Sequence, residues 1–373
     1  MTPVPYNGQA IEDDAFKVLI TGFGPFANIS QNPSWMAVKD LHNEVLVVDP
    51  TVEPVPVEPP AASLPPPPKR APPPQGPLPP LGAKPEPPSD KMDTTPDPVP
   101  APAPPPPPPP APAPPRAPPS DPSSDPIPIE IDRDPRQIHI TTHQVPVIYQ
   151  HVLDEVPTMH TRPPTFKHMP ELTPEIPAPE KGYDFVLHVG VAGRGPLRVE
   201  RRGHKIGYLM KDITGELPPI VAKAELTDQE KVELAMAQRH RAANNLDEKE
   251  AKVAEVPNRG FGVGYEKMPA ELETDINVPK LIHYIKESGM DEIYSSMDAG
   301  YYLCDFIYYC SLAEAQRAVA PSSNSPNHPE TPDRPRPTKV LFLHVPPVGQ
   351  PLSTEEVTET IKKIVIWVCS GLV

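Results

Sequence analysis

The chain has 373 residues, a formal net charge of −15 and 65 prolines, 36 of them within residues 51–130. A stretch so rich in proline lacks the backbone donors and the apolar area that a folded core needs. The acidic balance, without a large Lys/Arg block, excludes a nucleic-acid binder. No apolar run is long enough to span a membrane, and the N-terminus has no apolar signal segment. Three cysteines are too few for a disulfide scaffold, so we expect a cytoplasmic protein.

The composition indicates one globular domain of about 200–230 residues that is interrupted by long insertions. The boundaries are an N-terminal tail at 1–14, a first part of the domain at 15–50, a disordered proline-rich insertion at 51–136 and the remainder at 137–373. Polar composition marks further insertions near 220–270 and 319–338, and the charged residues 226–256 are expected to be exposed.

The first predicted elements are a buried strand at 16–21 and a helix capped by Asn32, with Pro33 at its first position, that runs to about His42. The later elements are a strand at 44–49, an edge strand at 138–149 that leads into a helix, a central strand at 185–191, a helix at 278–289, a strand at 293–296, a helix at 300–318, a strand at 340–345 and a helix from Ser353 to about Cys369. Strands that alternate with helices predict an α/β fold, a three-layer α/β/α sandwich around a mostly parallel mixed sheet.

A glycine pattern after the first strand, Gly22-x-Gly24-x-x-Ala27, is similar to a dinucleotide fingerprint, and Asp49 follows at a fitting distance. That motif works only when a helix begins at the glycines, so that the helix N-terminus meets the pyrophosphate. Here Pro25 and a further loop delay the helix until Asn32. We therefore expect no nicotinamide cofactor.

Cys304 is a candidate nucleophile because it lies early in a predicted helix, where the helix dipole favours a thiolate. The alternative is a small buried hydrophobic residue, as most single cysteines are. Cys310 and Cys369 lie deep inside predicted helices and are expected in the core.

A thiol nucleophile needs a base and a group to orient that base. His188 and His344 both lie in strands whose carboxyl ends could form a site, and either could serve as the base. Glu200 is a candidate orienting acid, or an exposed carboxylate paired with neighbouring arginines. His139 and His143 are four residues apart in an extended segment and share no helical face, so no metal site is expected.

Four segments in order resemble motifs of the pyroglutamyl-peptidase I family, also called pyrrolidone-carboxylate peptidases, which are cysteine peptidases. The segments are Thr21–Phe26 with Asn32–Trp35, His188–Gly193 leading to Glu200, Asp298–Phe306, and His344–Gly349. One motif of this kind would be weak, and four in register make chance unlikely. The resemblance covers residues 15–50, 137–215 and 270–370.

The resemblance implies removal of an N-terminal pyroglutamyl (5-oxoproline) residue from peptides, without metal or cofactor. It implies that Cys304 is the nucleophile, His344 the general base and Glu200 the orienting carboxylate. It further implies that Phe23, Phe26 and Tyr302 form the walls of the substrate site and that Asn32 helps to fix the loop. An arginine that binds the oxyanion in bacterial relatives has no secure counterpart, although Lys211 is nearby.

The proline-rich insertion has a separate interpretation. Pro65–Arg70 matches the P-x-x-P-x-R form that SH3-type grooves accept as polyproline II, whereas the alternative is an unstructured spacer. Two rival functions follow. One is a catalytically weak or silent relative that acts as a proline-rich interaction protein, and the other is a scaffold with a structural α/β domain.

Overall fold

The computed structural model describes residues 10–26, 29–48, 135–167, 169–221, 258–319 and 336–372, together with residues 229, 231–233, 235, 236 and 239. By its contacts the chain divides into two units, and every described residue belongs to the unit formed by 1–56 and 133–373. Residues 51–134 of the proline-rich insertion, which include the SH3-type motif, lie outside the described residues. So do most of the residues at 226–256, which are expected to be exposed, and most of the polar insertion expected at 319–338.

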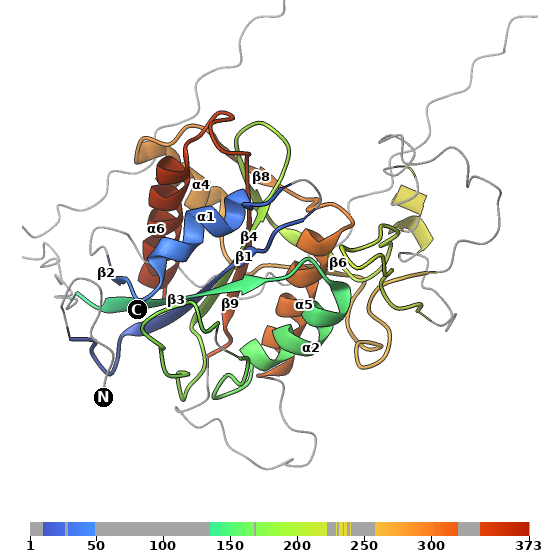
Figure 1. The fold of residues 1–373 in the computed structure, drawn as a ribbon, viewed down its shortest axis with the longest axis horizontal. Helices are drawn as coiled ribbons and strands as arrows, with labels where there is room; N and C mark the ends of the chain where they lie inside the picture. Colours follow the sequence, from blue (N-terminus) through green and yellow to red (C-terminus); the bar gives the residue numbers. More distant parts are fainter. Residues whose placement is uncertain are drawn as a thin grey trace, which may run out of the picture. The chain divides into compact units, whose positions relative to one another are not determined.

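A seven-stranded sheet forms the centre of this unit, in the order β2-β3-β1-β4-β9-β5-β8 (Figure 1). Four strands run parallel to one another: β3 (Gln137–Val145), β1 (Phe16–Phe23), β4 (Phe185–Val191) and β9 (Lys339–Val345). The antiparallel pairs are β2 (Val45–Val47) with β3 and β5 (Leu197–Glu200) with β9, while β8 (Ile293–Ser296) is parallel to β5. The mostly parallel mixed sheet that the sequence predicts is thus confirmed.

Helices cover both faces of the sheet (Figure 1). One face packs against α1 (Pro33–Val38), α4 (Val278–Glu287) and α6 (Thr354–Ser370), and the other against α2 (Tyr149–Met159) and α5 (Leu303–Arg317). The central strands read as almost continuous apolar runs because both of their faces are buried. A small second sheet, β6 (Arg202–His204) with β7 (Glu271–Glu273), lies against α5. None of the helices formed by the described residues is long and apolar enough to cross a membrane.

The helix starts follow local signals in the sequence. Asn32 caps α1 by accepting a hydrogen bond from the Ser34 backbone N–H, and Pro33 is the first helical residue. The α-helix ends at Val38 and continues as a 3₁₀ turn over Lys39–Leu41, slightly short of the predicted end. Ser353 and Glu356 form a reciprocal capping box at the start of α6.

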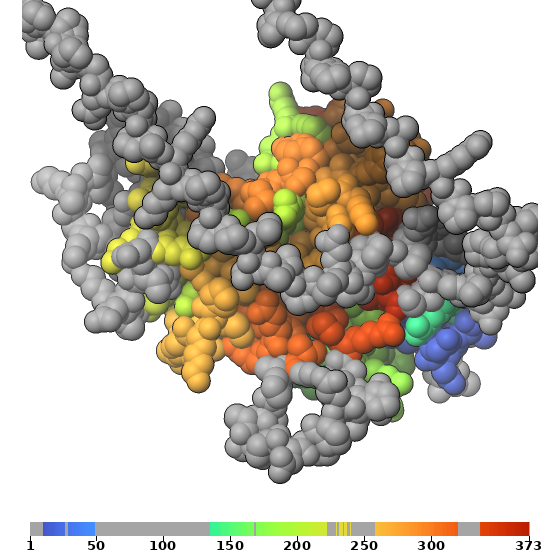
Figure 2. All heavy atoms as spheres, turned by 180° about the vertical axis from the view of Figure 1, so that it is seen from behind, coloured from blue at the N-terminus to red at the C-terminus, as the bar shows by residue number. Residues whose placement is uncertain are grey.

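One prediction about the strands is wrong. β3 is not an edge strand, because β2 pairs outside it. Pro146 is compatible with this inner position because the strand ends at Val145, before proline would remove a ladder donor. Within the stretch where a polar insertion is expected, near 220–270, Phe261 and Tyr265 are buried, and the Phe261 ring stacks on Phe306 of α5 at 4.1 Å. In Figure 2 this amber segment lies against the orange of α5.

The described ends of the long stretch between β2 and β3 meet. The Val48 backbone N–H donates a hydrogen bond to the Arg136 carbonyl oxygen, at 2.8 Å. This hydrogen bond extends the antiparallel pairing of β2 and β3 to the point where the chain leaves one strand and enters the other. Nearly ninety residues of chain separate the two strands.

Candidate active site

A buried carboxylate–imidazole pair joins β5 to β9. His344 Nδ1 lies 2.6 Å from Glu200 Oε1, and both side chains are buried. A carboxylate can only accept here, so Nδ1 donates and Nε2 is left for another partner. The His344 ring packs edge-on against Phe342 at 4.8 Å, which holds its plane. On the other side, the Tyr308 hydroxyl of α5 donates to the Glu200 carbonyl oxygen at 2.9 Å.

Cys304, the second residue of α5, lies over β4 beside this pair. Gly190 of β4 is the register partner of His344. A Cβ added to Gly190 would lie 2.8 Å from Cys304 Sγ and 2.7 Å from Phe342 Cζ. Only glycine lets the thiol approach the strand so closely. Cys304 Sγ therefore lies against Gly190 of β4, on the face of the sheet that α5 covers, and the strand position beside Gly190 on β9 is His344.

The charges around Cys304 oppose one another. Burial raises the pKa of the Cys304 thiol to about 12, and Glu200 and Asp305 act in the same direction while Arg198 lowers it. The thiol is therefore protonated at neutral pH and needs a base to become a nucleophile. Arg198 is the register partner of His344 on β5, so both side chains lie on the α5 face of the sheet. The Arg198 side chain forms neither a hydrogen bond nor an ion pair with the residues that the structure describes.

His188, the other candidate base, has a different environment. It is fully buried, and its Nδ1 lies 2.7 Å from Thr21 Oγ1. Burial lowers the pKa of His188 to about 3. Its Nε2 has no hydrogen-bond partner among the described residues. The carboxylate that could orient a base therefore contacts His344 and not His188.

A second buried pair lies directly after Cys304 in sequence. Asp305 Oδ1 lies 3.0 Å from His204 Nδ1, and Asp305 Oδ2 accepts a hydrogen bond from the Tyr208 hydroxyl at 2.6 Å. Burial alone would lower the pKa of His204, but the Asp305 charge outweighs it and raises that pKa to about 9. These contacts tie the first turn of α5 to β6. Sequence reasoning did not single out His204 or Tyr208, because nothing local marks them as partners of Asp305.

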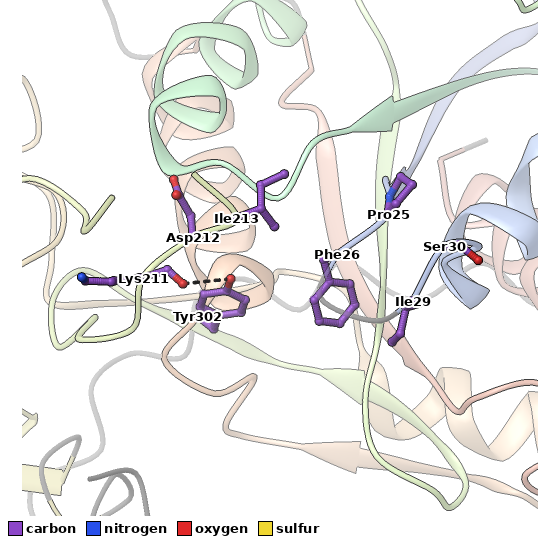
Figure 3. Close-up of a pocket in the computed structure, with 8 residues that line it drawn as sticks. All are labelled: Pro25, Phe26, Ile29, Ser30, Lys211, Asp212, Ile213 and Tyr302. Atoms are coloured by element: carbon purple, nitrogen blue, oxygen red, sulfur yellow. Dashed lines mark hydrogen bonds between the residues drawn. The ribbon is translucent and has the colours of Figure 1, made fainter. Parts of the chain in front are cut away.

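A pocket of about 650 Å³ lies beside the start of α5. One of its lining residues, Tyr302, is two positions before Cys304 in the sequence. It is lined by Pro25, Phe26, Ile29, Ser30, Lys211, Asp212, Ile213 and Tyr302 (Figure 3). The Phe26 and Tyr302 rings face its interior, and the Tyr302 hydroxyl donates to the Lys211 carbonyl oxygen at 3.2 Å (Figure 3). The Lys211 side chain extends away from the other labelled residues (Figure 3).

The four expected substrate-site residues have different places. Phe26 and Tyr302 line the pocket, whereas Phe23 is buried in the core cluster beneath α2 and does not line it. Asn32 is also buried, and its Nδ2 donates to the Gly24 carbonyl oxygen at 3.0 Å, which fixes the loop before α1.

The 211–213 wall of the pocket was missed from sequence. It is held by Asp212, whose Oδ2 accepts from the Tyr149 backbone N–H at 3.1 Å. No local sequence pattern predicts the contact between Asp212 and Tyr149, because the two residues are 63 positions apart.

Comparison with known proteins gives the following matches. No family model matches the chain. The chain is 23% identical over 234 residues to pyroglutamyl-peptidase 1 of Mus musculus and of Homo sapiens, which covers 62% of this chain and 73% of each relative. Among solved structures, pyroglutamyl peptidase I of Bacillus amyloliquefaciens has a TM-score of 0.45 at 16% identity, covering 95% of this chain and 97% of that one. A variant pyrrolidone carboxyl peptidase of Pyrococcus furiosus has a TM-score of 0.45 at 14% identity, covering 96% and 100%.

The curated relatives carry the name that the four sequence motifs suggest. The similarity extends well beyond those motifs, over 234 residues. The resemblance of this chain to the pyroglutamyl-peptidase I family is therefore confirmed.

Proposed function

We propose that this protein is a cysteine exopeptidase that removes an N-terminal pyroglutamyl residue from peptides through Cys304, His344 and Glu200. The observation that carries the proposal is the 2.6 Å contact between His344 Nδ1 and Glu200 Oε1, beside a strand over which Cys304 Sγ is held. Nucleophile, base and orienting acid come from α5, β9 and β5, and this combination is the requirement for thiol catalysis at neutral pH.

Burial and the Glu200 charge raise the pKa of Cys304, so the proposed first step couples removal of the thiol proton to attack by sulfur. The thiol proton moves to His344 Nε2 as Sγ attacks the carbonyl carbon that joins the pyroglutamyl ring to the next residue. An S–C bond forms, and the carbonyl electrons move onto oxygen. When the tetrahedral intermediate collapses, the C–N bond breaks and His344 returns the proton to the leaving amine.

Hydrolysis of the acyl-enzyme follows the same steps of proton removal, attack and collapse, with water as the nucleophile. His344 Nε2 takes a proton from water, the hydroxyl attacks the thioester, and Cys304 leaves as a thiolate that recovers its proton. Glu200 stabilises the imidazolium in both halves and keeps Nδ1 protonated, so that Nε2 always faces the reaction. The products are 5-oxoproline and a peptide shortened by one residue.

The pocket beside Cys304 supports a small, flat and uncharged first residue. Phe26 and Tyr302 offer two aromatic walls. The Asp212 carboxylate turns to the backbone, because its oxygens accept from Tyr149, Thr214 and Glu216 N–H groups. With the Lys211 side chain extended away (Figure 3), no free charge faces the pocket from its described lining residues. A neutral lactam suits such walls better than a charged α-amino group does.

The test is hydrolysis of a pyroglutamyl fluorogenic amide, with the prolyl and glutamyl amides as comparison substrates. We expect release from the pyroglutamyl amide only. Cys304→Ser should abolish turnover, while Cys310→Ser, which removes a fully buried thiol near Tyr265, should retain it. His344→Ala should lower kcat by about 10³-fold or more, and folded His188→Asn should be far less affected.

Two results would overturn the proposal. Equal cleavage of the three amides would remove the substrate assignment. A folded, inactive protein whose Cys304 reacts with iodoacetamide no faster than Cys310 would favour the silent relative. Binding of an SH3-type partner to Pro65–Arg70 and a cytoplasmic location stay predictions of the sequence.

A further inference from the structure

A second cluster of metal-ligating side chains lies at the junction of β3 and α2, outside the catalytic residues. His143 comes from β3, and His151 and Glu155 come from α2. Glu155 Oε2 is 2.6 Å from His151 Nε2 and 3.0 Å from His143 Nε2. One donor atom from each residue lies within 4.8 Å of the other two. β3 is separated from β9 by β1 and β4, so the cluster is remote from His344.

The backbone explains why these three side chains converge. His151 and Glu155 are four residues apart on α2 and therefore share one helical face. His143 faces the same helix from the sheet, and the Phe166 ring packs edge-on against it at 5.0 Å. The His143 side chain is 4% exposed, that of Glu155 13% and that of His151 36%. The cluster thus has a rigid inner side and one accessible side.

The donor set and its spacing suit zinc. Zinc binds histidine nitrogen at about 2.0–2.1 Å and carboxylate oxygen at about 2.0–2.2 Å, which places tetrahedral ligands about 3.3 Å apart. The two contacts to Glu155, at 3.0 and 2.6 Å, are shorter than this by about 0.3 and 0.7 Å, so the partly exposed His151 side chain would shift outward to admit the ion. Two imidazoles and one carboxylate form a borderline donor set that favours zinc over magnesium or calcium.

Charge and protons are compatible with a cation. The Glu155 carboxylate already accepts from both imidazoles, at 3.0 and 2.6 Å, so a cation placed among the three would replace the ring protons that face it. Among the described residues His143 Nδ1 has no hydrogen-bond partner, so this nitrogen can take the ring proton when Nε2 binds a metal.

We propose that His143 Nε2, His151 Nε2 and Glu155 bind one zinc ion, with solvent at the fourth position on the exposed side of His151. The ion ties the end of β3 to α2 and stabilises the fold, and it takes no part in peptide hydrolysis. The sequence analysis expected no metal, because it paired His143 with His139. In the structure His139 Nε2 instead contacts Asn43 Oδ1 at 2.9 Å.

The test is Co²⁺ and Zn²⁺ titration of the full chain without a polyhistidine tag. We expect one Co²⁺ per chain with the visible absorption of a four-coordinate ion, displaced by Zn²⁺, and a melting temperature that rises with zinc. His151→Gln removes a ligand at a partly exposed position and can still donate a hydrogen bond to Glu155. It should weaken zinc binding by about 100-fold or more and abolish the thermal shift.

Two controls distinguish this site from others. His283 and Glu287 form a similar i,i+4 pair at 3.2 Å on α4, without a third donor within the described residues, so His283→Gln should bind zinc like the parent. Cys304→Ser removes the thiol that could bind zinc at the catalytic residues and should also leave the stoichiometry at one. Absence of the Co²⁺ spectrum, binding unchanged in His151→Gln, or binding lost in Cys304→Ser would each refute the site.

Discussion

Replacing Gly190 with alanine should move Cys304 away from its base. The new methyl carbon would start 2.8 Å from Cys304 Sγ and 2.7 Å from Phe342 Cζ, both closer than real contacts allow. Phe342 is fully buried, so the strain cannot be relieved by a surface rotation. Overpacking of this kind costs about 1–3 kcal/mol. The lower flexibility of alanine in the unfolded chain offsets about 0.4–1 kcal/mol, which leaves a net loss of about 1–2 kcal/mol.

That loss corresponds to a melting temperature about 2–8 °C lower for a domain of this size. Activity should fall further, by about 100-fold in kcat/KM, because a shift of about 1 Å at a reacting atom is enough for that. Gly193→Ala is the matched control, three residues along the same segment. No atom lies within 4 Å of its added Cβ, and its φ is not in the left-handed region. Both variants are compared by thermal unfolding and by hydrolysis of the pyroglutamyl amide. Equal melting temperatures and equal kcat/KM values for Gly190→Ala and Gly193→Ala would refute the reasoning.

Three further perturbations test other parts of the structure. Arg198→Met should slow iodoacetamide alkylation of Cys304 at pH 7 by up to about tenfold, because it removes the charge that lowers the thiol pKa. An equal effect from the control Arg201→Met would contradict a local role for Arg198. The folded pKa of His204, about 9, lies above its usual 6.5, so the stability it contributes is full below about pH 6.5 and lost as the pH rises through 9. Urea unfolding of the parent should therefore show a loss of about 1–3 kcal/mol over that range that His204→Gln lacks, and parallel curves would reject the ion pair with Asp305. Deleting residues 51–130 and joining the ends with a short Gly/Ser linker should leave folding and kcat/KM close to those of the full chain, since 36 prolines provide no apolar face; a folded but inactive deletion variant would assign the insertion a role in catalysis.

The elements that the sequence predicted well carry their signals locally. The apolar run at 185–191 is a central strand because its residues are buried on both faces. Asn32-Pro33 and Ser353 start their helices through hydrogen bonds that span only a few residues. The histidine and carboxylate of the candidate site also lie at the ends of strands, but strand position alone left His188 and His344 equal, and only the family resemblance selected His344 and Glu200.

Positions that depend on distant pairing were not predictable. Phe23 and Phe26 are three residues apart and look equivalent in the sequence, but β1 ends at Phe23, and only the residue beyond it lines the pocket. His188 and His344 likewise look alike until the register of β5 against β9 places Glu200 beside His344 alone. The burial of Phe261 depends on Phe306, 45 residues later, and no local spacing reveals that contact.

We expect the chain to tolerate a cut between β2 and β3, because the hydrogen bond between Val48 and Arg136 holds the two ends of this stretch together. Residues before the cut carry β1, α1 and β2, and those after it carry the catalytic residues. β1 lies between β3 and β4, with eight register pairs to β3 and five to β4. Cleavage there would leave two fragments joined through the middle of one sheet and one core. We expect such fragments to stay together after proteolysis, and to reassemble when mixed, as a non-covalent complex that retains Cys304, His344 and Glu200 in place.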